Sequence, residues 1–111
     1  MAFTSGTRAV GTDSRGLGFE SALIQAVWEK GRVVPGVDPR FKRKGVCGAW
    51  IERSAYGKTA QLGSGWEIDH VKPVARGGSD ELYNLQPLQW QNNRAKGDSE
   101  FGWAAAAVAK E

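Results

Sequence analysis

Four residues in the second half of the chain have types and spacings that could support hydrolytic chemistry. Asp69 precedes the only histidine, His70; thirteen residues separate His70 from Asn84, and eight separate Asn84 from Asn93. An imidazole titrates near neutral pH and can take a proton from water. Carboxylate and amide oxygens are hard donors of the kind that Mg²⁺ and Mn²⁺ prefer. The stretch from Trp66 to Asp98 therefore predicts a metal-assisted site.

The element that must position Asp69 and His70 is a strand over residues 66–70. Alternation in this strand places Trp66, Ile68 and His70 on one side and Glu67 and Asp69 on the other. Adjacent Asp69 and His70 then cannot easily bind one ion together. One of them could hold a metal while the other contacts a water molecule on the other side of the phosphate.

The remaining site residues follow a long loop. Pro73 and the Gly77-Gly78 pair predict a turn-rich loop over residues 71–83, and residues 85–88 are suited to a brief second strand. Residues 89–96 predict a helix that ends at Gly97 in a C-cap position. Asn93 shares a face of this helix with Trp90 and Gly97, and Asn92 is the alternative ligand by position. Lys96 lies three residues after Asn93 and can reach the same area.

The first half of the chain is predicted to pack against this site and to provide a cluster of basic side chains. Residues 19–30 have apolar side chains at helical spacing, and residues 46–55 are typical of a strand with Val46, Trp50 and Ile51 buried. Residues 32–45 predict a loop in which four cations surround Phe41, which suits either phosphate contact or a solvated charge run. These cations are Arg40, Lys42, Arg43 and Lys44.

Composition limits the class of protein. The 111 residues are 41% hydrophobic and 24% charged, which predicts a single small globular domain. The chain shows no apolar run of membrane-spanning length and no leader, so we expect no membrane partner and a cytoplasmic location. One cysteine, Cys47, excludes an internal disulfide and a multi-cysteine zinc site.

Charge is unevenly distributed along the sequence. Residues 1–65 carry ten Lys/Arg against five Asp/Glu, whereas residues 66–111 carry five against seven. A basic half beside an acidic half suits a protein that grips a polyanion with one part and binds a cation with the other. The same imbalance is also compatible with solubility alone.

The segment from Trp66 to Asp98 resembles the HNH, or ββα-metal, endonuclease motif. The matching pieces are Ile68-Asp69-His70, Gly77-Gly78, Asn84-Leu85-Gln86-Pro87-Leu88 and Asn93-Arg94-Ala95-Lys96. Asn93 stands where the third letter is usually His, a variant also seen in the HNH domain of RNA-guided nucleases. The upstream segments resemble those of small bacterial and phage members. The paired-cysteine zinc site of many relatives is missing, so we expect no structural zinc and a fold braced by packing.

The resemblance implies a fold and a role for each site residue. The fold class is α+β: a single small domain in which an N-terminal helix and a strand precede the ββα-metal motif. A flexible arm over residues 1–17, a nuclease domain over 18–98 and a tail over 99–111 are expected. His70 would be the general base, Asp69 and Asn93 the ligands of one Mg²⁺ or Mn²⁺ ion, and Asn84 the residue that fixes the loop. Further phosphate-binding candidates around the motif are Lys72, Arg76, Arg94 and Lys96.

The expected function is hydrolysis of DNA phosphodiester bonds that leaves 5′-phosphate and 3′-hydroxyl ends. The alternative is a DNA-binding module of the same fold whose cleavage is silent. A phage or mobile-element setting is favoured over a toxin effector, because the sequence shows no delivery domain. Sequence specificity, nicking against double-strand cleavage, and oligomeric state do not follow from these residues.

Overall fold

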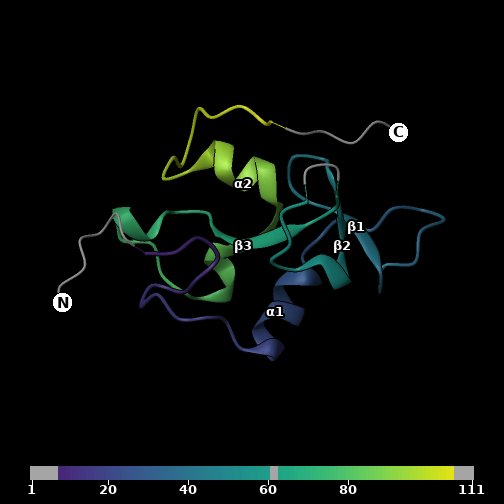
Figure 1. Cartoon of the computed structure of the whole chain (residues 1–111), viewed down its shortest axis with the longest axis horizontal. Helices are drawn as coiled ribbons and strands as arrows, with labels where there is room; N and C mark the ends of the chain where they lie inside the picture. The colour runs from purple at the N-terminus through teal and green to yellow at the C-terminus, as the bar shows by residue number, and fades with distance from the viewer. Residues whose placement is uncertain (1–7, 61–62, 107–111) are drawn as a thin grey trace.

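A computed structural model describes residues 8–60 and 63–106 of the chain. Within these residues the fold consists of two α-helices and two antiparallel hairpins, with short 3₁₀ turns between them (Figure 1). The elements follow the order α1 (Ser21–Trp28), β1 (Lys42–Lys44), β2 (Trp50–Glu52), β3 (Trp66–His70), β4 (Leu85–Gln89) and α2 (Trp90–Lys96). The predicted α+β class and the strand, loop, strand, helix order of the motif are confirmed.

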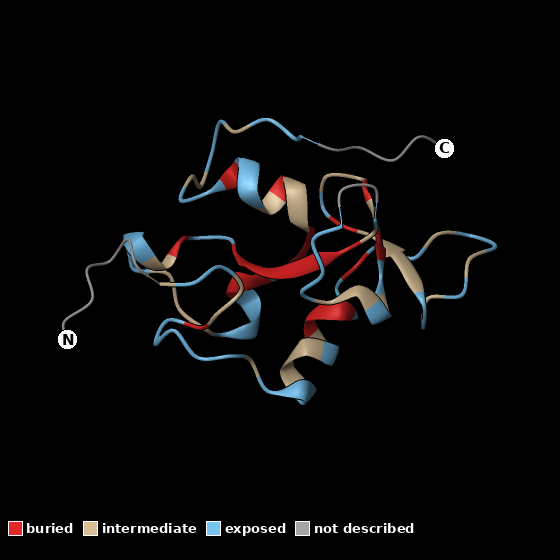
Figure 2. Cartoon of the chain, viewed as in Figure 1, coloured by how far each residue is buried: buried red, intermediate tan, exposed pale blue. Residues whose placement is uncertain are grey.

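The β3–β4 hairpin lies between the two helices. In Figure 1, α1 lies below the hairpin and α2 above it. The strands pair antiparallel from Trp66 opposite Gln89 to His70 opposite Leu85. Because each face of β3 is covered by a helix, all five of its residues are buried, and the hairpin forms the red centre of Figure 2. A strand with one solvated face would have shown alternating burial.

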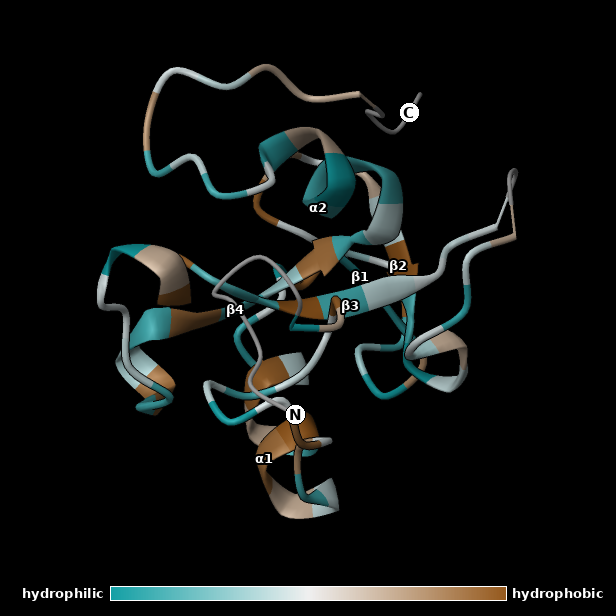
Figure 3. Ribbon diagram, turned by 60° about the vertical axis from the view of Figure 1, so that its left-hand side comes forward, coloured by the Kyte–Doolittle hydropathy of each residue, from teal (hydrophilic) through white to brown (hydrophobic). Residues whose placement is uncertain are grey.

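The two helices cover the hairpin with different chemistry. On the α1 side, Trp28 and Trp66 pack with ring centroids 5.4 Å apart, and Tyr56 meets Trp66 edge-on at 4.9 Å. In contrast, α2 is largely hydrophilic (Figure 3) and reaches β3 mainly through polar contacts. The apolar layer therefore stabilises the domain, while the polar layer between β3 and α2 contains Glu67, Asp69 and Asn93.

A side-chain hydrogen bond caps the start of α2, and a glycine ends the helix. The Gln89 side chain accepts from the backbone N–H of Asn92 at 3.0 Å, which satisfies one of the unpaired donors of the first turn. The buried Asn92 side chain also accepts from the Ala106 N–H at 2.8 Å and holds the segment after the helix. Gly97, with φ 52°, ends α2 where the sequence predicts its C-cap.

The prediction of a strand over residues 46–55 was wrong in its bounds. Only Trp50–Glu52 forms β2, and it pairs with β1, which lies in the stretch predicted as a loop. Gly48, with φ 86°, lies in the turn between them. Val46 in that turn is 64% exposed rather than buried. The sequence predicts a loop here because Lys42–Lys44 has no apolar alternation to indicate a strand.

The residues before α1 contact the body of the domain. Asp13 is buried and its Oδ1 accepts from the N–H groups of Arg15 and Leu17, both at 2.9 Å. Ser14 binds Asp80 in the loop after β3. Residues 8–17 thus make defined turns, whereas the rest of the predicted arm, 1–7, and the end of the predicted tail, 107–111, lie outside the described residues. None of the described helices is both long and apolar enough to cross a membrane.

Candidate active site

An open pocket brings together the end of β3, the start of the following loop and α2. The sequence-predicted residues Asp69, His70, Asn93 and Arg94 line this pocket, and Arg8 contributes to its wall. Three of the four motif residues therefore meet at one place, although they are up to 24 positions apart in the sequence. Asn84, the fourth, lies behind the loop that shapes the pocket.

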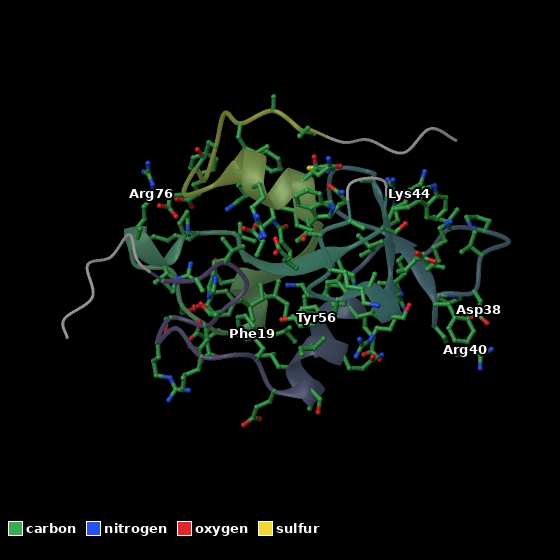
Figure 4. All side chains as sticks on the ribbon, in the orientation of Figure 1. Phe19, Asp38, Arg40, Lys44, Tyr56 and Arg76 are labelled. Atoms are coloured by element: carbon green, nitrogen blue, oxygen red, sulfur yellow. The ribbon has the colours of Figure 1, made fainter. Side chains whose placement is uncertain are left out.

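A carboxylate holds the His70 ring from the loop side. The ring is 4% exposed, and its Nε2 lies 2.8 Å from Oδ1 of Asp80. The Phe19 ring packs near it, with centroids 6.0 Å apart (Phe19 is labelled in Figure 4). Asp80 in turn accepts hydrogen bonds from the Ser14 N–H at 2.9 Å and the Ser14 hydroxyl at 2.5 Å. The segment before α1 thereby helps to fix the histidine.

The Asp80 contact selects the tautomer of His70. Partial burial pushes the pKa of Asp80 upward, but the hydrogen bonds from Ser14 and His70 outweigh this and hold the pKa below its ordinary value. The group is then an ionised acceptor at neutral pH, so Nε2 of the ring must carry the hydrogen. In the neutral ring, Nδ1 keeps the lone pair and is the atom able to take a proton.

Asp69 is a buried carboxylate with a partner on each oxygen. It is 5% exposed; Oδ2 accepts from Nε2 of Gln86 at 2.8 Å, and Oδ1 lies 3.1 Å from Nζ of Lys96. Burial raises the pKa of Asp69, although Gln86 and Lys96 oppose the rise by favouring the charged form. Each oxygen retains a further lone pair, so the carboxylate could still bind a cation.

The Asn93 side chain has one end bound and one end open. Its Nδ2 donates to Oε1 of Glu67 at 2.9 Å, while its Oδ1 accepts no hydrogen bond from the described residues. Asp69 and Asn93 thus offer two hard oxygen donors in one pocket, which suits Mg²⁺ or Mn²⁺. In the described part of the chain, no group of three or more His, Cys, Asp and Glu side chains could hold an ion. A cation here would therefore complete its coordination with water and phosphate oxygens.

The Asn84 side chain forms hydrogen bonds with the backbone of the loop. Its Oδ1 accepts from the Lys72 N–H at 2.8 Å, and its Nδ2 donates to the carbonyl oxygens of Lys72 at 3.1 Å and Ser79 at 2.8 Å. Gly78 lies so close to Lys72 that an added Cβ would be 1.7 Å from the Lys72 oxygen. This tight crossing needs both a glycine and a side chain that bonds to the backbone.

Replacing Asn84 with alanine is expected to lower the free energy of unfolding by about 1–3 kcal/mol, because buried backbone groups lose their partners. Chemical denaturation of the purified variant measures this. Ser79→Ala in the same loop is the matched control, since it removes only contacts of 3.3 Å and 3.4 Å. Equal stability of the two variants would show that the loop does not depend on Asn84.

The cations predicted around the motif differ in their availability. Lys72 and Arg76 are exposed, and the Arg94 side chain is 46% exposed at the pocket. Lys96, in contrast, is 3% exposed. Its Nζ lies 3.1 Å from Oδ1 of Asp69 and donates to the His70 carbonyl oxygen at 2.9 Å. In this structure Lys96 compensates a buried charge and does not face solvent.

The basic run around β1 forms a second, separate set of cations. Figure 4 shows Arg40 and Lys44 at one end of the molecule and Arg76 at the opposite end. Lys42 and Lys44 both lie over the Trp50 ring, 4.7 Å and 4.8 Å from its centroid. Arg43 binds the backbone oxygens of residues 29, 31 and 39, and Arg40 pairs with Asp38. The run is therefore part solvated surface and part structural support.

Sequence reasoning missed three side chains of the site. Asp80, Glu67 and Gln86 touch His70, Asn93 and Asp69 respectively. The strand register indicates that Glu67 shares a face with Asp69, and that Gln86 lies opposite Asp69 once β4 is paired. No comparable spacing indicates Asp80, because its contact depends on the path of an irregular loop.

Comparison with known families agrees with this geometry. Residues 46–99 match the family model of the HNH endonuclease. The chain carries an HNH endonuclease domain. The match spans β2, the β3–β4 hairpin and α2, whereas α1 and β1 lie outside it. No curated protein and no solved structure matches the chain. HNH nucleases act on DNA and use a divalent metal ion, and some HNH domains are catalytically inactive.

Proposed function

We propose that the chain is a metal-dependent endonuclease that hydrolyses phosphodiester bonds of DNA. The observation that supports this most is the convergence of Asp69, His70 and Asn93 on one open pocket. An imidazole with a defined tautomer and two oxygen donors are the groups that this hydrolysis needs. All the motif positions hold residues with workable chemistry, which favours an active enzyme over a silent DNA-binding module.

His70 would act as the general base. Asp80 holds Nε2, so Nδ1 would accept the proton from the water that attacks phosphorus. Burial of the ring between Phe19 and the loop restricts its motion and keeps Nδ1 in one direction. The segment before α1 would contribute indirectly, because Ser14 fixes the carboxylate that orients the ring.

Asp69 and Asn93 would hold the divalent ion. When bound, such an ion supplies positive charge that stabilises the developing negative charge on the phosphate and on the leaving 3′ oxygen. Gln86 and Lys96 hold the Asp69 carboxylate in place from the hairpin and from α2. Arg94, half exposed at the pocket, would bind a non-bridging oxygen of the same or a neighbouring phosphate.

Cations away from the pocket would bind the DNA backbone. Lys72 and Arg76 are exposed and flank the pocket loop. Arg40, which is exposed, and Lys44 lie at the far end of the molecule (Figure 4), and Lys42 and Lys44 are half-buried in β1. Because such contacts release counterions, affinity should fall steeply with salt and depend little on base sequence. Alanine at Lys42 and Lys44 should reduce this salt dependence without changing the chemistry.

A supercoiled-plasmid assay tests the proposal directly. We expect conversion of supercoiled DNA to nicked or linear forms with Mg²⁺ or Mn²⁺, and loss of conversion when EDTA is added. Products should carry 5′-phosphate ends that a ligase can reseal. Salt-dependent DNA binding without conversion under any divalent ion would indicate the silent module instead. Undiminished cleavage in EDTA would contradict the metal requirement.

A further inference from the structure

The buried carboxylate of Glu67 touches two consecutive residues of α2. Glu67 is 5% exposed and lies two positions before Asp69 in β3, on the strand face that α2 covers. Oε1 accepts from Nδ2 of Asn93 at 2.9 Å, and Oε2 accepts from the Arg94 guanidinium at 3.0 Å. Neither contact involves His70, the proposed general base.

A carboxylate in this position decides which way the Asn93 amide points. The oxygen and nitrogen ends of an amide have nearly the same shape, so packing alone does not distinguish them. An ionised carboxylate only accepts hydrogen bonds, so the NH₂ end must face Glu67. The oxygen end, Oδ1, is then left open at the pocket that Asn93 lines. Of the two ends, only the oxygen can bind a cation.

We infer that Glu67 is a positioning residue, which turns Asn93 so that its oxygen, rather than its nitrogen, is presented to a divalent cation. The inference rests on the proposed function, because it concerns the Asn93 ligand assigned there. A histidine ligand has no amide to turn, so it would not need a carboxylate for this purpose. Glu67 thus explains how asparagine can serve at the third motif position of this chain.

Replacing Glu67 with glutamine should reverse the amide. Glutamine has one accepting oxygen where glutamate has two, and Arg94 and Asn93 both donate to this side chain. The guanidinium forms the stronger, charge-assisted bond and would take the oxygen. The new NH₂ group would then donate to Oδ1 of Asn93 and withdraw it from the pocket. Residues that support a metal ligand typically change metal affinity by about 10–100-fold when replaced.

The test measures Mn²⁺ binding by electron paramagnetic resonance in the full chain without DNA. Wild type, Glu67→Gln, Asn93→Asp and the double variant form a thermodynamic cycle. In the wild-type background, Glu67→Gln should weaken Mn²⁺ binding about 10–100-fold. In the Asn93→Asp background it should weaken binding by less than about threefold, because a carboxylate offers oxygen at both ends and needs no orientation. Circular dichroism confirms that each variant is folded.

The cycle separates orientation from charge. Loss of the Glu67 charge alone would weaken cation binding equally in both backgrounds, and this result would overturn the inference. Unchanged binding in Glu67→Gln would also overturn it, while leaving the proposed nuclease function intact. Absence of Mn²⁺ binding by wild type would instead overturn the proposed metal site together with the inference. If Glu67→Gln does not fold, Glu67→Ala in the same two backgrounds gives the same comparison.

Discussion

Replacing His70 with alanine is expected to lower the rate of plasmid cleavage by about 10²–10⁴-fold, the contribution usual for a positioned general base. The imidazole is the only group of its kind in the chain, so no other histidine can take its place. Its Nε2 is bound to Asp80, so Nδ1 is the atom that would accept a proton from water. Single-turnover cleavage at fixed Mg²⁺ measures the chemical step.

Two controls separate loss of the base from loss of structure. His70→Gln keeps an N–H donor for Asp80 but cannot act as a base at neutral pH, so it should fold better than His70→Ala and be equally inactive. DNA affinity, measured at the same salt, should be close to wild type in both variants. Substantial cleavage by His70→Gln would show that water is activated by another group.

A modified substrate distinguishes the base from the metal ligands. A 3′-phosphorothiolate bond has a sulfur leaving group, which needs less stabilisation than an alkoxide. This substrate should therefore restore part of the activity of Asp69→Ala and Asn93→Ala, but none of the activity of His70→Ala. Equal rescue of all three variants would contradict the separate roles proposed for them.

The ββα portion of the fold could be predicted because its signals are local. Alternation over Trp66–His70, the turn residues of the loop and Gly97 after α2 each predict an element where the structure has it. β1 could not be predicted in this way, because a three-residue run of Lys-Arg-Lys has neither apolar alternation nor aromatic content. Its pairing with β2 depends on the turn between them, where Val46 is exposed.

The site was predictable as far as the motif extends. The spacing in the sequence predicts Asp69, His70 and Asn93 as site residues, and the structure places them around one pocket. The residues that contact them could not be predicted in this way. Glu67 meets Asn93 only because α2 packs on β3, and Asp80 meets His70 only because of the path of the loop. A motif therefore locates the candidate groups but does not show which side chains contact them.

The role of Lys96 could also not be predicted from the motif. Its replacement has the largest effect on stability that we expect. Its helical position predicts a phosphate contact, but its buried ammonium pairs with Asp69 at 3.1 Å and binds the His70 oxygen. Breaking a buried ion pair from one side leaves the other charge uncompensated, at a cost of about 3–5 kcal/mol. Lys96→Met is therefore expected to lower the free energy of unfolding by that amount near neutral pH.

The size of the Lys96→Met effect should depend on pH in a defined direction. Burial already raises the pKa of Asp69, and loss of the ammonium would raise it further. The pKa of Asp69 is then higher in the folded than in the unfolded state. Folding therefore becomes less favourable as pH rises from the unfolded pKa to the folded pKa. It becomes more favourable as pH falls and Asp69 takes up a proton. The destabilisation should thus be smaller at an acidic pH, near the ordinary pKa of an aspartate, than at neutral pH.

Urea denaturation at both pH values measures the change, with Lys72→Met as the matched control. Lys72 is exposed, so the same substitution there should alter stability by no more than about 0.5 kcal/mol at either pH. A divalent ion bound by Asp69 would replace part of the missing charge, so Mg²⁺ should stabilise Lys96→Met more than wild type. A penalty no larger than that of Lys72→Met would mean that Asp69 does not need the ammonium, and Lys96 would then be available for phosphate as its position predicts.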